Sequence, residues 1–339
     1  MIYPAKIIIS IFPVFLFLAA LIFLDSYKLV GVTKIIRAIA YGCLVALICY
    51  YLHRALIDLL NIKTVTYTRY ISPFIEEILK GLWIVQLLKR NKIGFVVDAS
   101  ILGFAIGSGF AFVENSYFVF TLHDSQVLVW ILRGFGTAIM HGGAQAVFAA
   151  LYQTIYEKIK YGHTLGFGLT ILTAVAIHSA YNHFLLSPVL SAIILIIFLP
   201  VIFMIAFEIS ERTTRNWLGS GLDTDIELMD IIESGIATNT RVGQYFEELQ
   251  SKFPGPVVAD MLCYLRLHIE LSMRAKGIML ARQHGLQVTC EYDIEAKFKE
   301  LEFLKKSIGK TGRIALLPLL RTSNRDLWQI HMLKGQKIN

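Results

Sequence analysis

The chain has 339 residues, of which 55% are hydrophobic and only 17% are charged, with a mean hydropathy of +0.59. Because an ordinary soluble domain carries roughly 25% charged residues, this composition excludes a purely soluble protein and indicates a membrane protein. The net charge of +7 does not point to nucleic acid, since basic residues beside membrane spans mark cytoplasmic loops. We therefore expect the lipid bilayer as the surroundings and no nucleic-acid partner.

Apolar segments of about 20 residues are long enough to cross a bilayer, and the sequence predicts about seven of them. They are residues 5–24, 35–56, 73–89, 95–121, 127–156, 164–186 and 189–208. Residues 1–210 thus form a transmembrane domain, whereas residues 211–339 have the polarity of a soluble domain. The predicted fold class is all-α, a polytopic membrane helix bundle with a C-terminal helical soluble domain of unknown role.

The soluble domain carries several helix start and stop signals. Asp223 or Thr224 is expected to cap one helix, Thr240 a second, and Pro256 to start a long third. A fourth helix is expected from Tyr292 to about Ile308, with Gly309 as its C-terminal stop. We find no catalytic or ligand-binding motif in this domain.

Basic residues predict the orientation in the membrane. They follow the first, third, fifth and seventh predicted spans, which must end on one side of the bilayer. The positive-inside rule therefore predicts a cell-membrane protein with an external N-terminus and a cytoplasmic C-terminal domain, although Lys63 and Arg69 on the other side oppose it. The supporting residues are Lys28, Lys34, Arg37, Lys89, Arg90, Lys92, Lys158, Arg212 and Arg215.

The segment SPFIEEILKGLW, residues 72–83, places charges in an apolar helix. Ser72 is expected to cap this helix, with Pro73 at its first position. Glu76 and Glu77 lie one turn from Lys80, so either could pair with it. One ion pair explains one glutamate but not two, and each unpaired intramembrane charge is costly. The pair therefore indicates a functional site.

The next three spans carry further polar residues. Glu114 and Asn115 lie in the fourth span, His141 in the fifth, and His178 and Asn182 in the sixth. No basic residue is within helical reach of Glu114, so it must be protonated, meet a charge on another helix, or bind a cation. Glycines of the fourth and fifth spans allow close helix packing: Gly103, Gly107, Gly109, Gly142 and Gly143.

Depth in the bilayer relates these residues to one another. At 1.5 Å per residue, Glu76 and Glu77 lie about 5–6 Å from the outer end of their span, Glu114 about 10 Å and His178 about 12 Å. His141 lies nearer the middle. Because four helices of alternating direction place their costly residues mainly in one leaflet, we predict one hydrated polar site that opens toward the outer leaflet.

These residue types suit the activation of water for hydrolysis. We predict Glu76, Glu77, Glu114 and His178 as catalytic, with Glu77 as the base and Glu76 as its partner. The predicted supporting residues are Lys80, Asn115, His141 and Asn182, the last as an oxyanion donor. A Zn²⁺ ion could be held by His141, His178 and Glu114, since two imidazoles and a carboxylate are a known catalytic ligand set.

The same residues resemble the motifs of the PrsW family of intramembrane proteases. Glu76-Glu77-Ile78-Leu79-Lys80 is similar to its EExxK motif, and Phe110 with Glu114 and Asn115 to its FxxxEN motif. His141, and His178 with Asn182, resemble the later motifs. The resemblance covers about residues 70–186 and extends distantly to CAAX prenyl and bacteriocin-processing membrane proteases. It implies hydrolysis of a peptide bond in a membrane protein, as in the regulated removal of a signalling factor. The family is labelled metallopeptidase and its relatives also glutamate proteases, so both mechanisms stay open.

Two other classes of protein could use such residues. A transporter or receptor could relay protons or bind a cation through Glu114 and His141, but no inverted repeat or pair of proline-broken spans supports this. A membrane lipid amidase would be expected to carry more histidines and a serine ligand. The sequence therefore favours an intramembrane protease.

Overall fold

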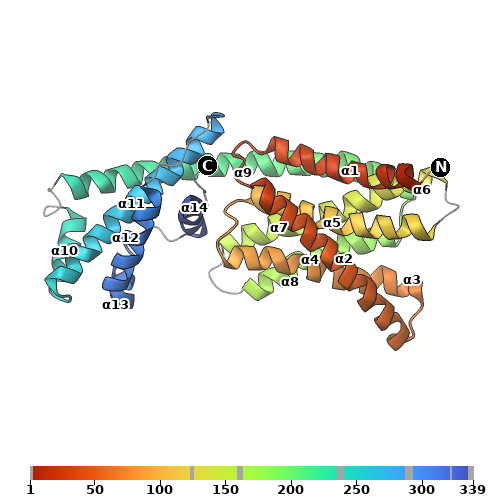
Figure 1. The fold of residues 1–339 in the computed structure, drawn as a ribbon, viewed down its shortest axis with the longest axis horizontal. Coiled ribbons are helices and arrows are strands. Elements are labelled where there is room, and N and C mark those ends of the chain that lie inside the picture. The colour runs from red at the N-terminus through yellow and green to blue at the C-terminus, as the bar shows by residue number, and fades with distance from the viewer. Residues whose placement is uncertain are drawn as a thin grey trace. The chain divides into compact units, whose positions relative to one another are not determined.

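The computed structural model describes residues 3–122, 126–158, 163–234, 240–286, 293–320 and 323–334. All regular structure in these ranges is helical, which confirms the predicted all-α class. The chain divides into two compact units, residues 1–211 and 212–339 (Figure 1). The helices of the first unit are α1 (Tyr3–Leu24), α2 (Val32–Leu60), α3 (Thr64–Thr66), the π-helical η1 (Tyr67–Ile71), α4 (Ser72–Lys89), α5 (Val96–Thr121), α6 (Val127–Leu132), the π-helical η2 (Arg133–Ala138), α7 (Ile139–Lys158), α8 (His163–Asn182) and the first part of α9 (Pro188–Glu233).

Six helical stretches of the described residues are long and apolar enough to cross a membrane, rather than the seven that the sequence predicted. They are Pro4–Leu24, Val32–Leu60, Val96–Thr121, Val127–Lys158, His163–Asn182 and Pro188–Glu233. The predicted third span forms α4, which has 18 residues and includes Glu76, Glu77, Lys80 and Lys89. Three of these charges, Glu76, Glu77 and Lys80, are buried inside the first unit, where α4 packs against α2, α5, α7 and α8.

The expected cap at Ser72 is wrong, although α4 begins at Ser72 with Pro73 in its first turn. Helical backbone runs without a break from α3 through η1 into α4, and no side chain caps the start of α4. The Ser72 hydroxyl instead donates a hydrogen bond to Glu76 Oε1 at 2.5 Å. Because helical backbone precedes Ser72, no free helix start remains there for its hydroxyl to cap.

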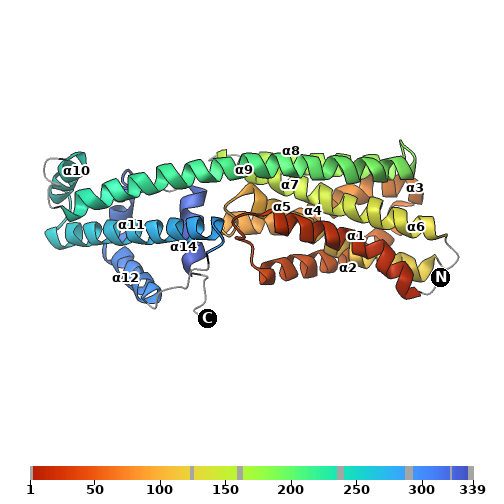
Figure 2. The same ribbon diagram turned by 90° about the horizontal axis from the view of Figure 1, so that it is seen from above.

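Helix α5 forms the centre of the first unit and packs along α7 (Figures 1 and 2). Its residues from Val97 to Ala111 are all buried. The predicted role of its glycines in close packing is confirmed: a Cβ added at Gly107 would lie 2.2 Å from the carbonyl oxygen of His141, and one at Gly103 2.6 Å from that of Gln145. Glycine therefore sets the distance between α5 and the part of α7 that carries His141.

The second unit is arranged around a long helix, α11 (Gly255–Gln283), which contacts α10 (Arg241–Gln250), α12 (Ile294–Ser307), α13 (Gly309–Leu316) and α14 (Asn324–Lys334). The predicted cap Thr240 is confirmed, because its hydroxyl accepts from the Gly243 amide at 3.2 Å. Gly309 follows the end of α12 in a left-handed conformation with φ +65°, as the sequence predicted. Tyr292, the expected start of that helix, lies outside the described residues.

The expected new helix at Asp223 or Thr224 is wrong, since α9 continues unbroken from Pro188 to Glu233. Asp225 is buried against α11, where its Oδ2 accepts from Lys276 Nζ at 2.5 Å and from the Ser272 hydroxyl at 2.6 Å. Packing against α11 therefore fixes this stretch as helix, and the local capping signal has no effect.

Candidate active site

The charged residues of α4 point into the protein. Glu76, Glu77 and Lys80 have relative exposures of 7%, 0% and 0%. Lys80 Nζ donates to Glu77 Oε1 at 2.5 Å, lies 3.3 Å from His141 Nδ1, and sits 4.4 Å from the centre of the Phe110 ring. Of the two glutamates that could pair with Lys80, the fold thus selects Glu77.

Both oxygens of Glu77 have hydrogen-bond partners. Its Oε1 accepts from Lys80 and also from His178 Nδ1 at 2.8 Å. Its Oε2 accepts from Gln145 at 3.2 Å when that amide is oriented so that its oxygen also accepts from the Gly81 amide. Glu77 is therefore a fully bonded carboxylate that holds Lys80 and His178 in place.

Glu76 is different, because only one of its oxygens is bonded. Oε1 accepts from the Ser72 hydroxyl and lies 3.2 Å from His53 Nε2. Oε2 is buried without a hydrogen-bond partner and faces His178 Nε2 at 4.0 Å. A buried unpaired carboxylate oxygen is costly, so this atom indicates a place where another group binds.

Glu114 on α5 meets a positive charge from another helix. Its Oε2 lies 3.4 Å from Arg133 Nη2 and accepts from His141 Nε2 at 3.1 Å. Asn115 completes this arrangement, since its Oδ1 accepts from Arg133 Nε at 2.9 Å and its Nδ2 donates to the Ser10 carbonyl at 2.7 Å. Asn115 therefore positions Arg133 against Glu114.

The two histidines join these groups into one network. Their rings lie 4.7 Å apart and nearly perpendicular, at 88°. A carboxylate only accepts hydrogen bonds, so His178 carries its proton on Nδ1, toward Glu77, and His141 carries one on Nε2, toward Glu114. In neutral His178 the lone pair on Nε2 is thus free and lies toward Glu76.

A pocket of about 370 Å³ opens beside these groups. Glu76, Glu114 and His53 line it together with apolar and aromatic side chains. The other lining residues are Ala46, Leu47, Cys49, Tyr50, Tyr51, Thr68, Ser72, Phe110, Val113, Tyr117 and Phe118. An apolar pocket with a few polar groups at one end is typical of a ligand or substrate site.

Three side chains suit a metal ion. Glu76, His141 and His178 each offer a donor atom, and these atoms lie within 4.8 Å of one another. Oxygen and imidazole nitrogen are ligands that Zn²⁺ accepts, and the bond from His178 to Glu77 is the outer-shell contact typical of zinc-bound histidine. The free Glu76 Oε2 also fits such an ion, whereas His141 could bind it only through Nδ1, which lies 3.3 Å from Lys80 Nζ, so that Lys80 would have to move aside. The ligand set predicted from the sequence contained Glu114 in place of Glu76. In the structure, Oε2 of Glu114 instead contacts Arg133 and His141.

The structure thus brings together seven of the eight site residues that the sequence named, and leaves Asn182 apart. Asn182 Nδ2 donates to the Thr68 carbonyl at 3.0 Å and joins the end of α8 to η1. Four contributing residues were missed. His53, Arg133 and Gln145 could have been found, because each is a polar side chain inside a predicted span. Tyr67, whose hydroxyl contacts His53, lies between two predicted spans and gave no such signal.

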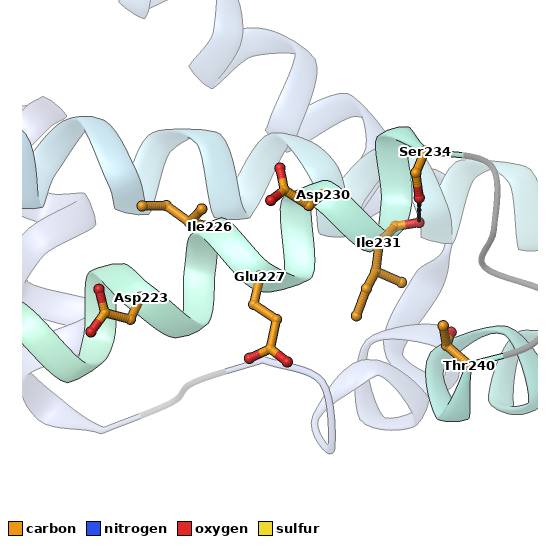
Figure 3. A pocket seen from close by; sticks show the side chains of 7 residues that line it. All are labelled: Asp223, Ile226, Glu227, Asp230, Ile231, Ser234 and Thr240. Carbon is orange, nitrogen blue, oxygen red and sulfur yellow. Dashed lines mark hydrogen bonds between the residues drawn. The ribbon is translucent and has the colours of Figure 1, made fainter.

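The second unit has a pocket of about 550 Å³ along α9 (Figure 3). It is lined by Asp223, Glu227 and Asp230, with Ile226, Ile231, Ser234 and Thr240. The three carboxylates lie on the exposed face of the helix, and the described residues that line the pocket include no imidazole or basic side chain. This surface therefore has no groups for acid–base chemistry like those in the first unit.

A bundle of membrane-spanning helices around buried glutamates and histidines defines a multi-pass membrane protein with a hydrolase-like site. The family model described as PrsW family intramembrane metalloprotease matches residues 31–207. The chain therefore belongs to the PrsW family of intramembrane proteases, as the motifs predicted. Comparisons with curated proteins and with solved structures give no match.

Proposed function

We propose that this protein hydrolyses a peptide bond of a membrane protein with a water molecule activated between Glu76 and His178. The observation that carries the proposal is the unbonded Glu76 Oε2, 4.0 Å from His178 Nε2. A water molecule about 2.8 Å from each atom can bridge that separation. This assignment reverses the sequence-based one, because the contacts of Glu77 favour a positioning role and those of Glu76 favour the role of base.

The chemistry follows from the contacts of each residue. Glu76 accepts the proton of the attacking water and returns it to the leaving amine. Glu77 fixes the His178 ring, so that Nε2 stays directed at the water. Lys80 and Arg133, each paired with a site carboxylate, hold Glu77 and Glu114 beside the two imidazoles.

The same residues fit the metal that the family description names. Glu76, His141 and His178 would hold the ion, which when bound supplies a Lewis acid that polarises water or the scissile carbonyl. Glu77 and Glu114 would then act as outer-shell carboxylates that orient the two imidazoles.

The pocket beside Glu76 supports an apolar substrate. Aromatic side chains from α2 and α5 line it, and its volume of about 370 Å³ is large enough for a bulky side chain. We infer that a membrane-embedded or membrane-adjacent segment enters here, with a large apolar side chain near the cleaved bond. Regulated removal of a signalling factor is a biological role that this substrate class allows.

Cleavage of a single-span fluorescent reporter by the purified full-length protein in lipid vesicles tests the proposal. We expect Glu76→Gln to lower kcat at least about 100-fold, the low end of the contribution of a general base. Glu247→Gln, at an exposed position on α10, is the matched control and should leave cleavage unchanged. Wild-type cleavage by Glu76→Gln would rule the assignment out.

Elemental analysis of the same preparations tests the metal. If the three residues hold zinc, wild-type protein should bind about one ion per chain and lose it in His178→Ala, while Glu247→Gln retains it. Cleavage by metal-free protein at the wild-type rate would instead support activation of water by the carboxylate alone.

A further inference from the structure

Glu76 is held by a histidine that belongs to none of the motifs singled out in the sequence. His53 lies on α2, and its side chain is 17% exposed where it lines the pocket beside Glu76. Its Nε2 lies 3.2 Å from Glu76 Oε1, and its Nδ1 lies 2.7 Å from the hydroxyl oxygen of Tyr67. Both ring nitrogens are therefore engaged by specific partners.

These partners determine which nitrogen of His53 carries the proton. The Glu76 carboxylate can only accept, so Nε2 must be the donor. In the neutral ring Nδ1 is then an acceptor, and the Tyr67 hydroxyl supplies its hydrogen. Tyr67 itself is 1% exposed and packs edge-on against the ring with centroids 5.4 Å apart. Glu76 thus fixes the tautomer of His53, and Tyr67 holds the orientation of the ring.

The consequence for Glu76 is that its two oxygens are no longer equivalent. Oε1 receives hydrogen bonds from both His53 and Ser72, whereas Oε2 receives none. Ser72 alone could follow the carboxylate as it rotates, because a hydroxyl on a short side chain reorients easily. The His53 ring cannot, since Tyr67 holds its other side.

We propose that His53, oriented by Tyr67, is a positioning residue that binds Glu76 Oε1 and so directs Oε2 to the reacting water. This inference rests on the proposed function. It adds residues of α2 and η1 to a site whose other residues come from α4, α5, α7 and α8. It also gives the π-helical turn η1 a role, because that turn places Tyr67 beside His53.

The test measures kcat and KM for reporter cleavage by the full-length protein. His53→Leu should lower kcat about 10- to 100-fold, as is typical for the loss of an outer-shell partner, with KM within about threefold. His53→Gln keeps an N–H at the position of Nε2 and should recover most of that loss. Tyr67→Phe should lower kcat about tenfold, whereas Tyr70→Phe, at an exposed position on the same turn, should not.

A double-mutant cycle and a spectrum separate positioning from mere packing. Because Tyr67 acts through the ring of His53, Tyr67→Phe should have no further effect in the His53→Leu background, which has no group for the Tyr67 hydroxyl to bind. In ¹⁵N-histidine-labelled protein, the His53 signals should show the Nε2–H tautomer, and the Nδ1 signal should shift in Tyr67→Phe, which lacks the hydroxyl that donates to it. This readout does not depend on cleavage.

The outcomes distinguish this inference from the proposed function. If Glu76→Gln abolishes cleavage while His53→Leu keeps the wild-type kcat, only the positioning role is wrong. An additive effect of Tyr67→Phe in His53→Leu, or a His53 Nδ1 signal that Tyr67→Phe leaves unchanged, would also overturn it. If Glu76→Gln cleaves normally, the proposed function fails and the role of His53 fails with it.

Discussion

Glu77 and Lys80 form an ion pair without any exposed surface, one helical turn apart. Such a pair has a large desolvation cost, which its own attraction and added hydrogen bonds must offset. Here His178, His141 and Gln145 supply those bonds. The stability of the site therefore depends on the complete network, and loss of one partner leaves the other charge buried.

Lys80→Met should lower the free energy of unfolding by about 3–5 kcal/mol, the usual cost of breaking a buried pair from one side. Lys80→Met with Glu77→Gln should recover a large part of this loss, because the unpaired charge is removed. Thermal unfolding in detergent measures both. Lys299→Met, at a solvent-exposed pair with Glu295, is the control and should not change the unfolding temperature. Equal losses in the single and double variants would contradict the argument.

At the scale of helices, the distance between α5 and α7 sets the position of His141. Gly107 allows this approach, since a Cβ there would lie 2.2 Å from the His141 carbonyl oxygen and 2.6 Å from the Gly142 Cα. Both are backbone atoms, so they can move only if the helix moves. Close helix packing through small residues thus serves the site directly.

Gly107→Ala should destabilise the protein by about 1–3 kcal/mol through overpacking and lower cleavage, because α7 must shift with His141. Gly168→Ala on α8 is the matched control. A Cβ at Gly168 meets nothing within 4 Å, so alanine there should stabilise slightly, by about 0.5–1 kcal/mol. Unfolding temperature and kcat measured together check this; normal values for Gly107→Ala would contradict it.

The helices of the second unit carry a pH-sensitive residue, His268 on α11. Burial lowers its pKa below the usual 6.5, with Asp225 and Asp326 opposing and Lys276 reinforcing the shift. The unfolded chain therefore binds a proton more readily than the folded one, and stability rises with pH. The contribution of neutral His268 to the free energy of unfolding should be fully present above about pH 6.5. It should decrease as the pH falls toward the lower pKa of the folded state.

Hydrogen–deuterium exchange of α11 in the full-length protein, corrected for intrinsic exchange rates, can measure this dependence. Protection should decrease between about pH 7 and pH 5.5. His268→Gln, which cannot be protonated in this range, should show a flatter profile. The same steep profile in His268→Gln would assign the effect to other groups.

At the scale of the whole molecule, the boundary between the two units falls within α9, at residues 211 and 212. All groups of the candidate site belong to the first unit, and so does the whole family match, which ends at residue 207. We infer that the second unit adjusts substrate choice or regulation and takes no part in the chemical step.

A chain truncated after Thr214 should therefore still cleave a short membrane peptide in detergent, with kcat within about threefold of the full-length value and altered selectivity among longer substrates. Full-length Glu76→Gln provides the baseline without cleavage. Loss of cleavage by a truncated chain that remains folded would assign the second unit to the active site.

Basic residues after α4 and after the apolar part of α9 predict that the second unit is cytoplasmic. Protease treatment of intact cells should leave this unit uncut, whereas permeabilised cells should lose it. Digestion in intact cells would reverse the topology, and with it the expectation that the site opens toward the outer leaflet.

The sequence by itself determined the class of the molecule. Length and hydropathy of the apolar runs fix which segments can lie in a bilayer, and the cost of a charge in lipid makes Glu76, Glu77, Lys80 and Glu114 conspicuous without any structure. The same reasoning located His141 and His178, and the order of the motifs indicated the family that residues 31–207 match.

Only the tertiary structure decided how these residues are paired. Spacing along α4 allowed Lys80 to bind either glutamate. In the folded protein His53 from α2 contacts Glu76 and His178 from α8 contacts Glu77, and Lys80 pairs with Glu77. Arg133 took the oxygen of Glu114 that the sequence had assigned to a metal. Such choices depend on distances between residues far apart in the chain. Periodicity along one helix predicts which residues share a face, but the packing of several helices determines what that face meets.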